Sequence, residues 1–369
     1  MIRVGIVGLG KMGLSHLAMF NAHPDVTVAG VCDTSSYVLS VLGKNTGLTT
    51  YTDYDTMLEK AKLDAVVICT PSVMHGAQVS AALDRGLHVF CEKPFCLDPA
   101  ESDALAQRAE KLGLVTQVGY HYRFVGAFEE VRRLLDAGAI GTVTHVLAEA
   151  YGPVVLKPKG GTWRSQRTEG GGCLYDYAAH PLNLLTWYFG VPTGVSGSVL
   201  GRVFSQETDD EVTSTLHLPG GATASLSVSW SDDSQRKMTT KLTLWGTHGR
   251  IFVDRQEVQV YLRDTAEVPP GYEQGWNVRY TTDLTEPVWF YVRGEEYSSQ
   301  VDAFVQRVVT GTTKGENTFR SAADTDLVIA AIVADAEKAP TPVGGAHPAV
   351  RKAPAPPART GLRRLLPQR

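Results

Sequence analysis

The sequence predicts two domains: an N-terminal α/β domain with a doubly wound parallel sheet, and a C-terminal α+β domain with a mainly antiparallel sheet. The chain has 369 residues, more than a single hydrophobic core usually supports, so about two domains are expected. Up to about residue 120, apolar strand-like runs alternate with helix-like segments. After about residue 142, short alternating segments follow one another directly, which is typical of antiparallel strands.

Five apolar runs are the predicted strands of the first domain, which we place at residues 1–120. They read IRVGIVG, VTVAGVCD, LDAVVICT, LHVFCE and LVTQVG. Amphipathic stretches at Lys11–Asn21, Val73–Arg85 and Pro99–Lys111 lie between them and have helical spacing. Strand followed by helix, repeated in this way, indicates a parallel sheet with helices on both faces.

The second domain, residues 121–338, is predicted from period-two alternation. The segments ATASLSVSW, KLTLWG, RIFVD and VQVYLRD follow each other across short Gly, Asp or Arg turns, which favours antiparallel pairing. A helix-like stretch at Gly172–Tyr188 interrupts the strands, and two more, at about Glu296–Thr310 and Arg320–Lys338, end the domain.

Residues 339–369 form a tail rich in Pro, Ala, Gly and Arg, with no acidic residue. Such a segment cannot bury enough apolar area to offset the entropy of ordering, so we predict that it is disordered. Its basic character and its PAPP run leave an interaction tail open, although a non-functional extension is the favoured interpretation.

The composition excludes several classes of protein. Lys plus Arg number 35 and Asp plus Glu 39, so the net charge of −4 makes no case for nucleic-acid binding. No apolar stretch is long enough to span a membrane, and strand-forming residues from position 2 leave no room for a secretory signal. The five cysteines include no CxxC pair, which indicates neither a disulfide framework nor a zinc site. We therefore expect a cytoplasmic protein.

A glycine-rich turn, Gly8-Leu9-Gly10-Lys11-Met12-Gly13, follows the first predicted strand and opens a helix. In this context it is the dinucleotide-binding fingerprint of a Rossmann domain. Gly8 lets the backbone turn, Gly10 lets it approach a pyrophosphate, and Gly13 lets the helix pack on the strand. Free N–H groups and the helix dipole then attract the phosphates.

Asp33 ends the second predicted strand, 20 residues beyond Gly13. A carboxylate at this spacing accepts hydrogen bonds from the adenosine ribose hydroxyls. It also repels a 2′-phosphate, and no arginine follows it in DTSS. The sequence therefore predicts NAD rather than NADP.

Two further groups of residues carry candidate chemistry. Lys93, in Cys91-Glu92-Lys93-Pro94, follows a strand at the edge where such sheets bind ligands, and Pro94 restricts it to an extended conformation. Asp176 and His180 fall at i and i+4 on the predicted helix at Gly172–Tyr188, and Asn183 follows at i+7. Oxidation of an alcohol requires a base with a pKa near the working pH, and histidine suits that role. Pro181 is expected to kink this helix.

These motifs resemble those of the Gfo/Idh/MocA family of oxidoreductases, which includes glucose–fructose oxidoreductase and inositol dehydrogenase. The resemblance covers roughly residues 1–338 and rests on GLGKMG, CTPSVMH (Cys69–His75), CEKP, GYHYRF (Gly119–Phe124) and GGGCLYDYAAH (Gly170–His180). It implies a Rossmann domain followed by an open-faced antiparallel sheet that often mediates oligomerisation, here a homodimer or homotetramer. It also implies NAD or NADP as cofactor and a sugar, cyclitol or nucleotide sugar as substrate.

The resemblance also implies roles for individual residues. Lys93 would polarise the reacting oxygen, His180 would be the general base in oxidation, and Asp176 would hold a substrate hydroxyl and orient His180. The implied cofactor residues are Gly8, Gly10, Lys11, Met12, Gly13, Asp33, Thr70, Pro71, His75 and Glu92. Many relatives have aspartate where this chain has Asn183, so substrate choice or the pKa of His180 is expected to differ.

Other residues are weaker candidates for the substrate site. His121, Tyr122 and Arg123 lie at a predicted strand end and could contact the nicotinamide or the substrate. Trp163 and Arg164 precede the three glycines, where an aromatic face could stack on a sugar. His16 is interpreted as a helix-face residue rather than a ligand. No cluster has the spacing of a metal site, so no metal is predicted.

Three functions stay open at this level. The favoured one is an NAD-dependent dehydrogenase acting on the CH–OH group of a polyhydroxylated substrate. The second is a redox-neutral, NAD-dependent enzyme that cleaves glycosides by transient oxidation and elimination. The third is a non-catalytic regulator that senses NAD(P), although the presence of Lys93, Asp176 and His180 argues against it.

Overall fold

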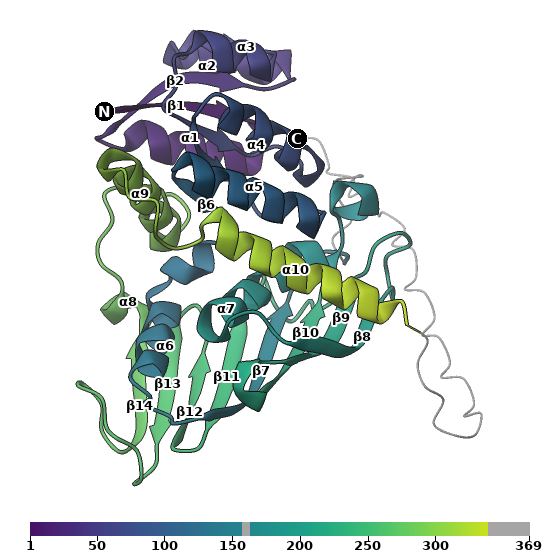
Figure 1. The fold of residues 1–369 in the computed structure, drawn as a ribbon, viewed down its shortest axis with the longest axis vertical. Coiled ribbons are helices and arrows are strands. Elements are labelled where there is room, and N and C mark those ends of the chain that lie inside the picture. The colour runs from purple at the N-terminus through teal and green to yellow at the C-terminus, as the bar shows by residue number, and fades with distance from the viewer. Residues whose placement is uncertain (157–162, 339–369) are drawn as a thin grey trace, which may run out of the picture. The chain divides into compact units, whose positions relative to one another are not determined.

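The computed structural model describes residues 1–156 and 163–338, and these residues form two β-sheets with helices packed around them (Figure 1). The prediction of a disordered tail at residues 339–369 lies outside the described residues. The predicted boundary at residue 120 falls between the last strand of the first sheet and the first strand of the second.

The first sheet has six strands in the order β3-β2-β1-β4-β5-β6. They are β1 (Ile2–Val7), β2 (Val26–Cys32), β3 (Thr50–Tyr51), β4 (Ala65–Ile68), β5 (His88–Cys91) and β6 (Thr116–Val118). All neighbouring pairs run parallel, which confirms the predicted doubly wound sheet. The strand order reverses between β1 and β4, and ligands of such sheets bind outside the carboxyl ends of the strands at this point.

Two of the five helices in this part of the chain start at an aspartate cap, and one of these also ends at a glycine. They are α1 (Lys11–Ala22), α2 (Ser36–Thr46), α3 (Tyr54–Lys60), α4 (His75–Asp84) and α5 (Pro99–Leu112). The side chains of Asp53 and Asp98 accept hydrogen bonds from backbone N–H groups at the starts of α3 and α5, and Gly113 ends α5 with φ of 65°. Helices α1, α4 and α5 confirm the predicted segments, whereas α2 and α3 were not predicted.

The second sheet has eight strands in the order β14-β13-β12-β11-β7-β10-β9-β8. They are β7 (Val143–Tyr151), β8 (Gly194–Gly201), β9 (Glu211–His217), β10 (Thr223–Ser229), β11 (Lys241–Gly246), β12 (Gly249–Val253), β13 (Glu257–Leu262) and β14 (Gly275–Tyr280). The pairing is mainly antiparallel, as predicted, but β7 and β10 run parallel. The chain passes through a helix and two strands between them, and parallel neighbours require such a long connection.

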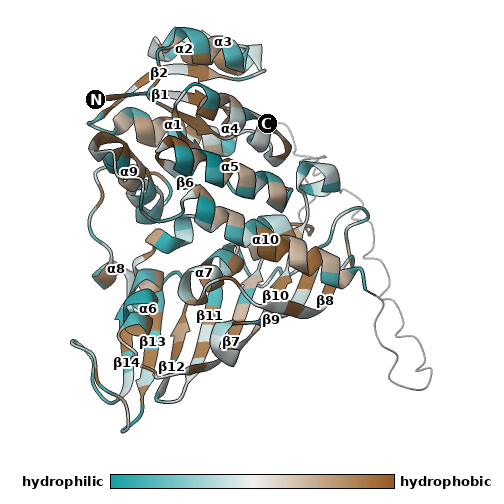
Figure 2. Ribbon diagram, viewed as in Figure 1, coloured by the Kyte–Doolittle hydropathy of each residue, from teal (hydrophilic) through white to brown (hydrophobic). Residues whose placement is uncertain are grey.

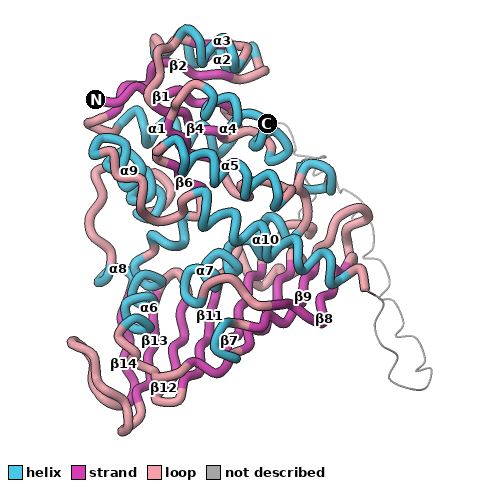
Figure 3. The backbone as a smooth tube through the Cα atoms, viewed as in Figure 1, coloured by secondary structure: helices cyan, strands magenta, loops and turns pink. Residues whose placement is uncertain are grey.

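One face of the second sheet is buried, and the other is partly exposed. Ala148, Leu226 and Leu244 belong to the buried face, and they alternate with half-buried residues such as Leu147 and Ser227. Figure 2 shows this alternation of apolar and polar residues along the strands. Helices α6 (Gly126–Asp136), α7 (Ala179–Phe189) and α10 (Phe319–Ala336) lie on the buried side (Figure 3). The sheet is thus covered by helices on its apolar face.

The last helices connect the two sheets. Helix α8 (Thr281–Leu284) leads to α9 (Glu295–Thr310), whose Phe304 packs edge-on against Phe20 and Phe90 in the first sheet's core. Helix α10 packs against both α5 and α7. The final helices therefore fix the carboxyl edge of the first sheet beside α7, and they confirm the two helices predicted at the end of the second domain.

Other features of the described residues bear on the class of protein. Among residues 1–156 and 163–338, no helix is both long and apolar enough to cross a membrane. All five cysteines are free thiols. In the same residues, no group of three or more His, Cys, Asp or Glu side chains is arranged to hold a metal ion.

Asp326 on α10 is a buried carboxyl group beside the loop that follows β5. Its Oδ2 accepts a hydrogen bond from the Cys96 backbone N–H at 3.0 Å, while its Oδ1 has no partner among the described residues. Burial raises the pKa of Asp326 to about 8, although hydrogen bonds from backbone N–H groups act in the opposite direction. The folded protein therefore keeps this proton up to about pH 8, whereas an unfolded aspartate releases it near pH 3.8.

Replacement of Asp326 by asparagine is expected to change how stability depends on pH. Between these pKa values the unfolded wild-type chain binds fewer protons, so its free energy of unfolding falls as pH rises, by up to about 1.4 kcal/mol per pH unit. Asp326→Asn lacks this loss. Urea unfolding at about pH 5, 6 and 7 measures the free energy of unfolding of wild type and variant. The control is Asp335→Asn on the same helix, because the pKa of Asp335 is lowered rather than raised. If the free energies of unfolding of wild type and Asp326→Asn differed by the same amount at every pH, the raised pKa of Asp326 would be contradicted.

Candidate active site

The glycine-rich turn joins β1 to α1 and leaves one open position. Gly8 has φ of +84°, and a Cβ there would lie 2.7 Å from backbone atoms of Cys69 and Thr70. A Cβ on Gly13 would lie 1.7 Å from the Gly8 carbonyl oxygen. At Gly10, by contrast, no atom of the described residues other than Gly10 and its chain neighbours lies within 4 Å of the point that a Cβ would occupy. Packing thus requires Gly8 and Gly13, whereas Gly10 keeps a space free at the N-terminus of α1, beside Lys11 and Met12.

Asp33 lies directly beside this turn. Its Oδ2 accepts a hydrogen bond from the Leu9 backbone N–H at 2.6 Å, and its Oδ1 accepts one from the Ser35 N–H at 2.8 Å. The carboxylate therefore holds the turn in place at the carboxyl end of β2. A carboxylate so placed fits the ribose of a bound dinucleotide.

Thr70, Pro71 and His75 follow β4, and His75 connects two loops. Its Nε2 lies 3.0 Å from the Thr70 carbonyl oxygen, and its Nδ1 lies 2.9 Å from that of Pro94. Burial lowers the pKa of His75, although these carbonyl groups act to raise it. The buried imidazole thus ties the loop after β4 to the loop that carries Lys93. Pro71 directly precedes a 3₁₀ turn at Ser72–Met74.

Lys93 reaches from the loop after β5 to the second domain. Its Nζ donates hydrogen bonds to Asp176 Oδ1 at 2.9 Å and to the Asp176 backbone carbonyl oxygen at 2.8 Å. The Lys93–Pro94 peptide bond is cis. The structure therefore brings the two predicted residues together across the two sheets.

Asp176 is bound by two cations. Besides Lys93, Arg164 donates from Nε to Asp176 Oδ2 at 2.8 Å. Burial alone would raise the pKa of Asp176, but the charges of Lys93 and Arg164 and their hydrogen bonds lower it. The guanidinium of Arg164 also lies over the Trp163 ring, 4.9 Å from its centroid. Arg164 therefore lies at Asp176, and Trp163 packs against Arg164.

The segment that carries Asp176 is not the regular helix that the sequence predicts. Leu174–Ala178 form a π-helical turn, and α7 begins only at Ala179. Because Pro181 has no N–H, it donates no hydrogen bond to a carbonyl of the preceding turn, and the α-helical hydrogen-bond pattern is interrupted there. The Asp176 carbonyl instead accepts from Lys93. The assumed i, i+4, i+7 alignment was therefore wrong for Asp176.

Asp209 stabilises the start of this segment, and it was not predicted. Its Oδ2 accepts a hydrogen bond from the Leu174 N–H at 2.7 Å, and its carbonyl accepts one from the Cys173 N–H at 2.9 Å. Gly172 has φ of +117°, and a Cβ there would lie 2.5 Å from Asp209 Oδ1. The glycines before Asp176 thus allow close packing of a capping carboxylate.

His180 lies in a cage of aromatic rings. The rings of Tyr120, His121 and Tyr122 surround it at centroid distances of 6.1, 5.2 and 5.1 Å. Its side chain is only 4% exposed, and its Nδ1 has no hydrogen-bond partner in residues 1–156 and 163–338. The weaker candidates His121 and Tyr122 are therefore placed beside a predicted catalytic residue, together with Tyr120, which was not predicted.

The protonation of His180 depends on burial and on Lys93. Burial first, and the charge of Lys93 second, lower the pKa of His180 well below its ordinary 6.5. The imidazole is therefore neutral near pH 7 and able to accept a proton. Asp176 makes no hydrogen bond to His180 in the part of the chain described, so its predicted orienting role is not seen.

Arg123 and Asn183 bind each other rather than the residues at Lys93. Arg123 Nε donates to Asn183 Oδ1 at 2.9 Å, and Asn183 Nδ2 donates to Thr325 Oγ1 at 3.1 Å. The Arg123 guanidinium also lies over Trp187, 5.4 Å from the ring centroid. These bonds connect the segment after β6 to α7 and α10. Substrate contact by Arg123 or Asn183 stays a prediction.

Glu92 and His16 form a buried pair that the sequence did not predict. His16, interpreted as a helix-face residue, is fully buried, and its Nε2 lies 2.6 Å from Glu92 Oε1. Glu92, expected to line the cofactor, therefore has one carboxylate oxygen engaged within the protein. The position of His16 beside Leu17, on the apolar face of α1, is a signal that could have revealed its burial.

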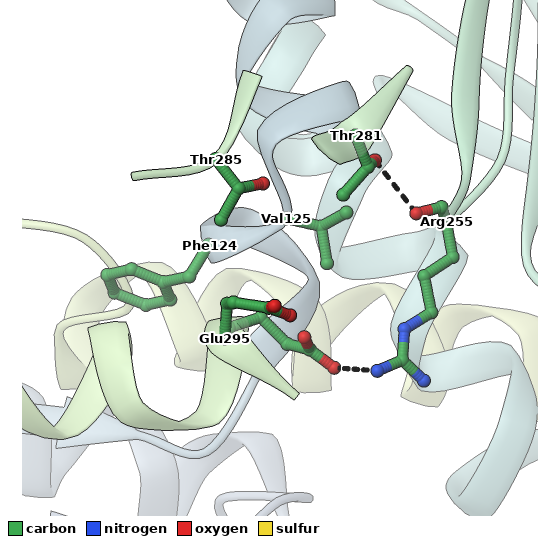
Figure 4. A pocket seen from close by; sticks show the side chains of 7 residues that line it. Phe124, Val125, Arg255, Thr281, Thr285 and Glu295 are labelled. Carbon is green, nitrogen blue, oxygen red and sulfur yellow. Dashed lines mark hydrogen bonds and ion pairs between the residues drawn. The ribbon is translucent and has the colours of Figure 1, made fainter. Parts of the chain in front are cut away.

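A small cavity lies near this site but does not include Lys93, Asp176 or His180 (Figure 4). Its volume is about 50 Å³, and it is lined by Phe124, Val125, Arg255, Thr281, Thr285, Glu295 and Glu296. The Arg255 guanidinium donates to the buried Glu296 carboxylate. Because such a volume holds only a few water molecules, we assign the chemistry to the groups around Asp176 instead.

The fold and these residues define a two-domain protein in which a dinucleotide-binding Rossmann domain supplies a lysine to an Asp–His segment of the second domain. The profile described as "Oxidoreductase family, NAD-binding Rossmann fold" matches residues 2–120, and that of the "GFO/IDH/MocA C-terminal domain" matches residues 128–252. The chain belongs to the Gfo/Idh/MocA family of oxidoreductases, as its motifs indicated.

Curated relatives of the chain are named as sugar oxidoreductases. It is 28% identical to D-glucoside 3-dehydrogenase of Escherichia coli (strain K12) over 52% of this chain and only 55% of that protein. It is 30% identical to dTDP-3,4-didehydro-2,6-dideoxy-alpha-D-glucose 3-reductase of Streptomyces violaceoruber over 69% of this chain and 73% of that protein. Inositol dehydrogenases are also among the matches.

A solved structure of levoglucosan dehydrogenase, in complex with NADH and levoglucosan, shares the fold. The TM-score is 0.81 with 21% identity, and the match covers 91% of this chain and 97% of that one. At this identity the likeness shows the fold alone. It supports the description of a six-stranded parallel sheet followed by a mainly antiparallel one.

Proposed function

We propose that the chain is an NAD-dependent dehydrogenase that transfers a hydride between a nicotinamide cofactor and a secondary hydroxyl of a sugar, cyclitol or nucleotide sugar. The observation that carries the proposal is the pair of hydrogen bonds from Lys93 Nζ to Asp176, which places an ammonium group of one domain beside the His180 segment of the other.

The bound cofactor would supply a hydride acceptor, and this chain's residues would manage the proton and the charge. Lys93 donates a hydrogen bond to the reacting oxygen and stabilises negative charge that develops on it. Neutral His180 accepts the hydroxyl proton in oxidation and returns it in reduction. Asp176, held ionised by two cations, keeps Lys93 in position and is a candidate acceptor for a second substrate hydroxyl. The aromatic rings around His180 exclude water from the proton transfer.

The residues of the first domain fit a dinucleotide. The open space at Gly10 lies at the N-terminus of α1, where N–H groups and the helix dipole favour a phosphate. Asp33 would accept from the adenosine ribose, and its charge favours NAD over NADP. Lys11, Met12, Thr70 and Pro71 would line the cofactor at the ends of β1 and β4. His75 and Glu92 would act by supporting the loops.

Substitution of Gly10 by valine is expected to abolish cofactor binding without unfolding the protein. The φ of Gly10 is −66°, and the Cβ position is free of described atoms other than its chain neighbours, so a small side chain should fit there until a phosphate must enter the space. We expect NADH affinity, measured by fluorescence titration, to fall at least about 100-fold. Gly13→Ala is the matched control, since its Cβ collides with Gly8 and should lower the melting temperature. Unchanged NADH binding by Gly10→Val would contradict the assignment.

A substrate screen tests the proposed function. Purified protein is incubated with NAD and, in turn, inositols, hexoses, glucosides and nucleotide sugars, and NADH is followed by absorbance. The relatives support these classes of substrate, and we expect NADH formation with at least one of them. Release of an aglycone without NADH would favour the redox-neutral alternative. Cofactor binding without turnover of any of these compounds would favour the regulator.

We also propose that the protein is a cytoplasmic homodimer or homotetramer that associates through the second sheet. The partly exposed face of that sheet carries Trp245, Tyr261 and Trp276, of which Trp276 is 59% exposed. Apolar side chains gathered on an uncovered sheet face are typical of a protein interface. Light scattering coupled to gel filtration measures the mass, and a monomer at micromolar concentration would contradict the proposal.

A further inference from the structure

The His16–Glu92 pair connects two parts of the proposed active site. His16 lies on α1, the helix whose N-terminus holds the open space at Gly10, and Glu92 directly precedes Lys93. The His16 Nε2 to Glu92 Oε1 distance of 2.6 Å joins residues 76 positions apart in the chain. This side-chain contact thus joins the predicted cofactor helix to the residue that directly precedes the proposed catalytic lysine.

Glu92 passes this contact on to Lys93. Its second oxygen, Oε2, accepts a hydrogen bond from the Lys93 backbone N–H at 3.2 Å. Gly119 leaves room for the carboxylate, since a Cβ there would lie 2.9 Å from Oε1. Burial alone would raise the pKa of Glu92, but the hydrogen bond from His16 and the charge of Lys93 lower it. The carboxylate is therefore ionised and held in one place.

Among the described residues, the only polar contact of the His16 ring is to Glu92, and its other neighbours include aromatic rings. Its ring packs against Phe90 with centroids 4.9 Å apart, and against Phe20 at 6.3 Å. Its Nδ1 has no hydrogen-bond partner in the described ranges. In the tautomer with hydrogen on Nε2, the imidazole donates to Glu92 and leaves only a lone pair unpaired, which costs less than an unpaired N–H.

We infer that His16 is a positioning residue that, through Glu92, holds Lys93 against Asp176. The inference rests on the proposed function, because Lys93 is assigned there to the reacting oxygen. Lys93 has a long flexible side chain, and its two hydrogen bonds to Asp176 require its backbone to be fixed. Catalysis is sensitive to such placement, since a displacement of about 1 Å can cost about 100-fold in rate. His16 touches no reacting atom and acts only through its neighbour.

The test compares His16→Phe, which fills the space but cannot donate, with His16→Gln, which can. We expect His16→Phe to lower kcat about 10- to 100-fold with little change in KM for the substrate found in the screen. His16→Gln and wild type should differ by less than about 5-fold. In a Lys93→Ala background, His16→Phe should have no further effect on kcat, because the group that it positions is gone. An equal loss in both backgrounds would overturn the inference.

His23→Phe is the matched control. His23 lies just after α1, and its Nε2 forms a similar pair with Asp302 at 3.0 Å, but that pair has no connection to Lys93. We expect His23→Phe to keep kcat within about 2-fold of wild type while it lowers stability. A loss of kcat equal to that of His16→Phe would show a general effect of removing a buried histidine, and would refute a positioning role.

Crystal structures separate this inference from the proposed function. If the wild-type protein oxidises no compound in the screen, the proposed function fails, but the geometry is still measurable. The His16→Phe structure is expected to show the Lys93 Nζ displaced from Asp176, with the hydrogen bonds of 2.8 and 2.9 Å both broken. The same hydrogen bonds intact in that variant would overturn the inference whatever the activity.

Discussion

Lys93→Ala is expected to lower kcat by about 1000-fold, because it removes the donor proposed to stabilise charge on the reacting oxygen. The lysine is the link between the two domains at this site, through two hydrogen bonds to Asp176. Removing it leaves a buried carboxylate paired with Arg164 alone, so the free energy of unfolding should also fall, by about 1–3 kcal/mol. Steady-state kinetics and urea unfolding measure the two effects.

The control for this variant is Arg164→Ala, which also removes one cation from Asp176. Arg164 is more exposed and donates a single hydrogen bond to the carboxylate. We expect Arg164→Ala to lower stability to a similar extent but to retain far more activity than Lys93→Ala. Equal losses of activity in the two variants would indicate that the charge balance at Asp176, rather than the lysine itself, carries the effect.

His180→Asn is expected to lower kcat for oxidation by about 100- to 10,000-fold, since it removes the proposed general base. Asparagine keeps a polar group of similar reach but does not accept a proton near neutral pH. His145→Asn, on the second sheet and stacked on Trp245, is the control and should retain activity. A His180 variant with wild-type kcat would contradict the assignment of the base.

The pH profile of wild type gives a second test of His180. Oxidation requires the neutral imidazole, so kcat/KM should fall only as pH drops through the pKa of His180 in the free enzyme. Burial and the Lys93 charge lower that pKa well below 6.5, so the rate should hold at pH 6.5 and fall below it. In Lys93→Met the positive charge is absent, and the acid limb should move to higher pH. An acid limb above pH 6.5 in wild type would contradict the assignment.

The same histidine should make the fold sensitive to acid. Because its folded pKa is lowered, an unfolded chain binds a proton at His180 that the folded chain does not, and stability is lost as pH falls below 6.5. His121, whose pKa is lowered mainly by burial and then by His180, acts in the same direction. The buried Asp326 acts in the opposite direction, so comparison of single variants is required to separate them.

Local pattern was enough to predict most of the first domain and its glycine-rich turn. The run from Ile2 to Gly13 combines a buried strand, three glycines and a helix start within a few residues, and Asp33 lies at a regular distance. Each of these features depends on residues close in the chain or on the strand–turn–helix–strand unit in which they lie. The positions of Gly8, Gly13 and Asp33 follow from that unit.

Contacts between distant residues could not be predicted in this way. Asp209 caps the Leu174 segment from 35 positions away, and His16 meets Glu92 across 76 positions. Arg123 and Asn183 have the composition of a substrate site, yet they hydrogen-bond to each other because the fold packs α7 against the segment after β6. Which polar groups satisfy one another inside the protein depends on tertiary packing.

The π-helical turn at Asp176 illustrates the same limit. Pro181 signals an irregularity, but whether the chain kinks, ends the helix or widens a turn depends on what occupies the freed space. Here Lys93, from another domain, donates to the Asp176 carbonyl. A regular helix was predicted, whereas the structure has a π-helical turn in which the Asp176 carbonyl accepts from a residue 83 positions away.

A crystal structure with NADH and an identified substrate is the sharpest test of the proposed mechanism. We expect Lys93 Nζ and a ring nitrogen of His180 both to lie within about 2.6–3.2 Å of the same substrate oxygen. The carbon that bears this oxygen should face the nicotinamide ring. A substrate oxygen bound by neither group, or Lys93 and His180 facing separate ligands, would contradict the mechanism.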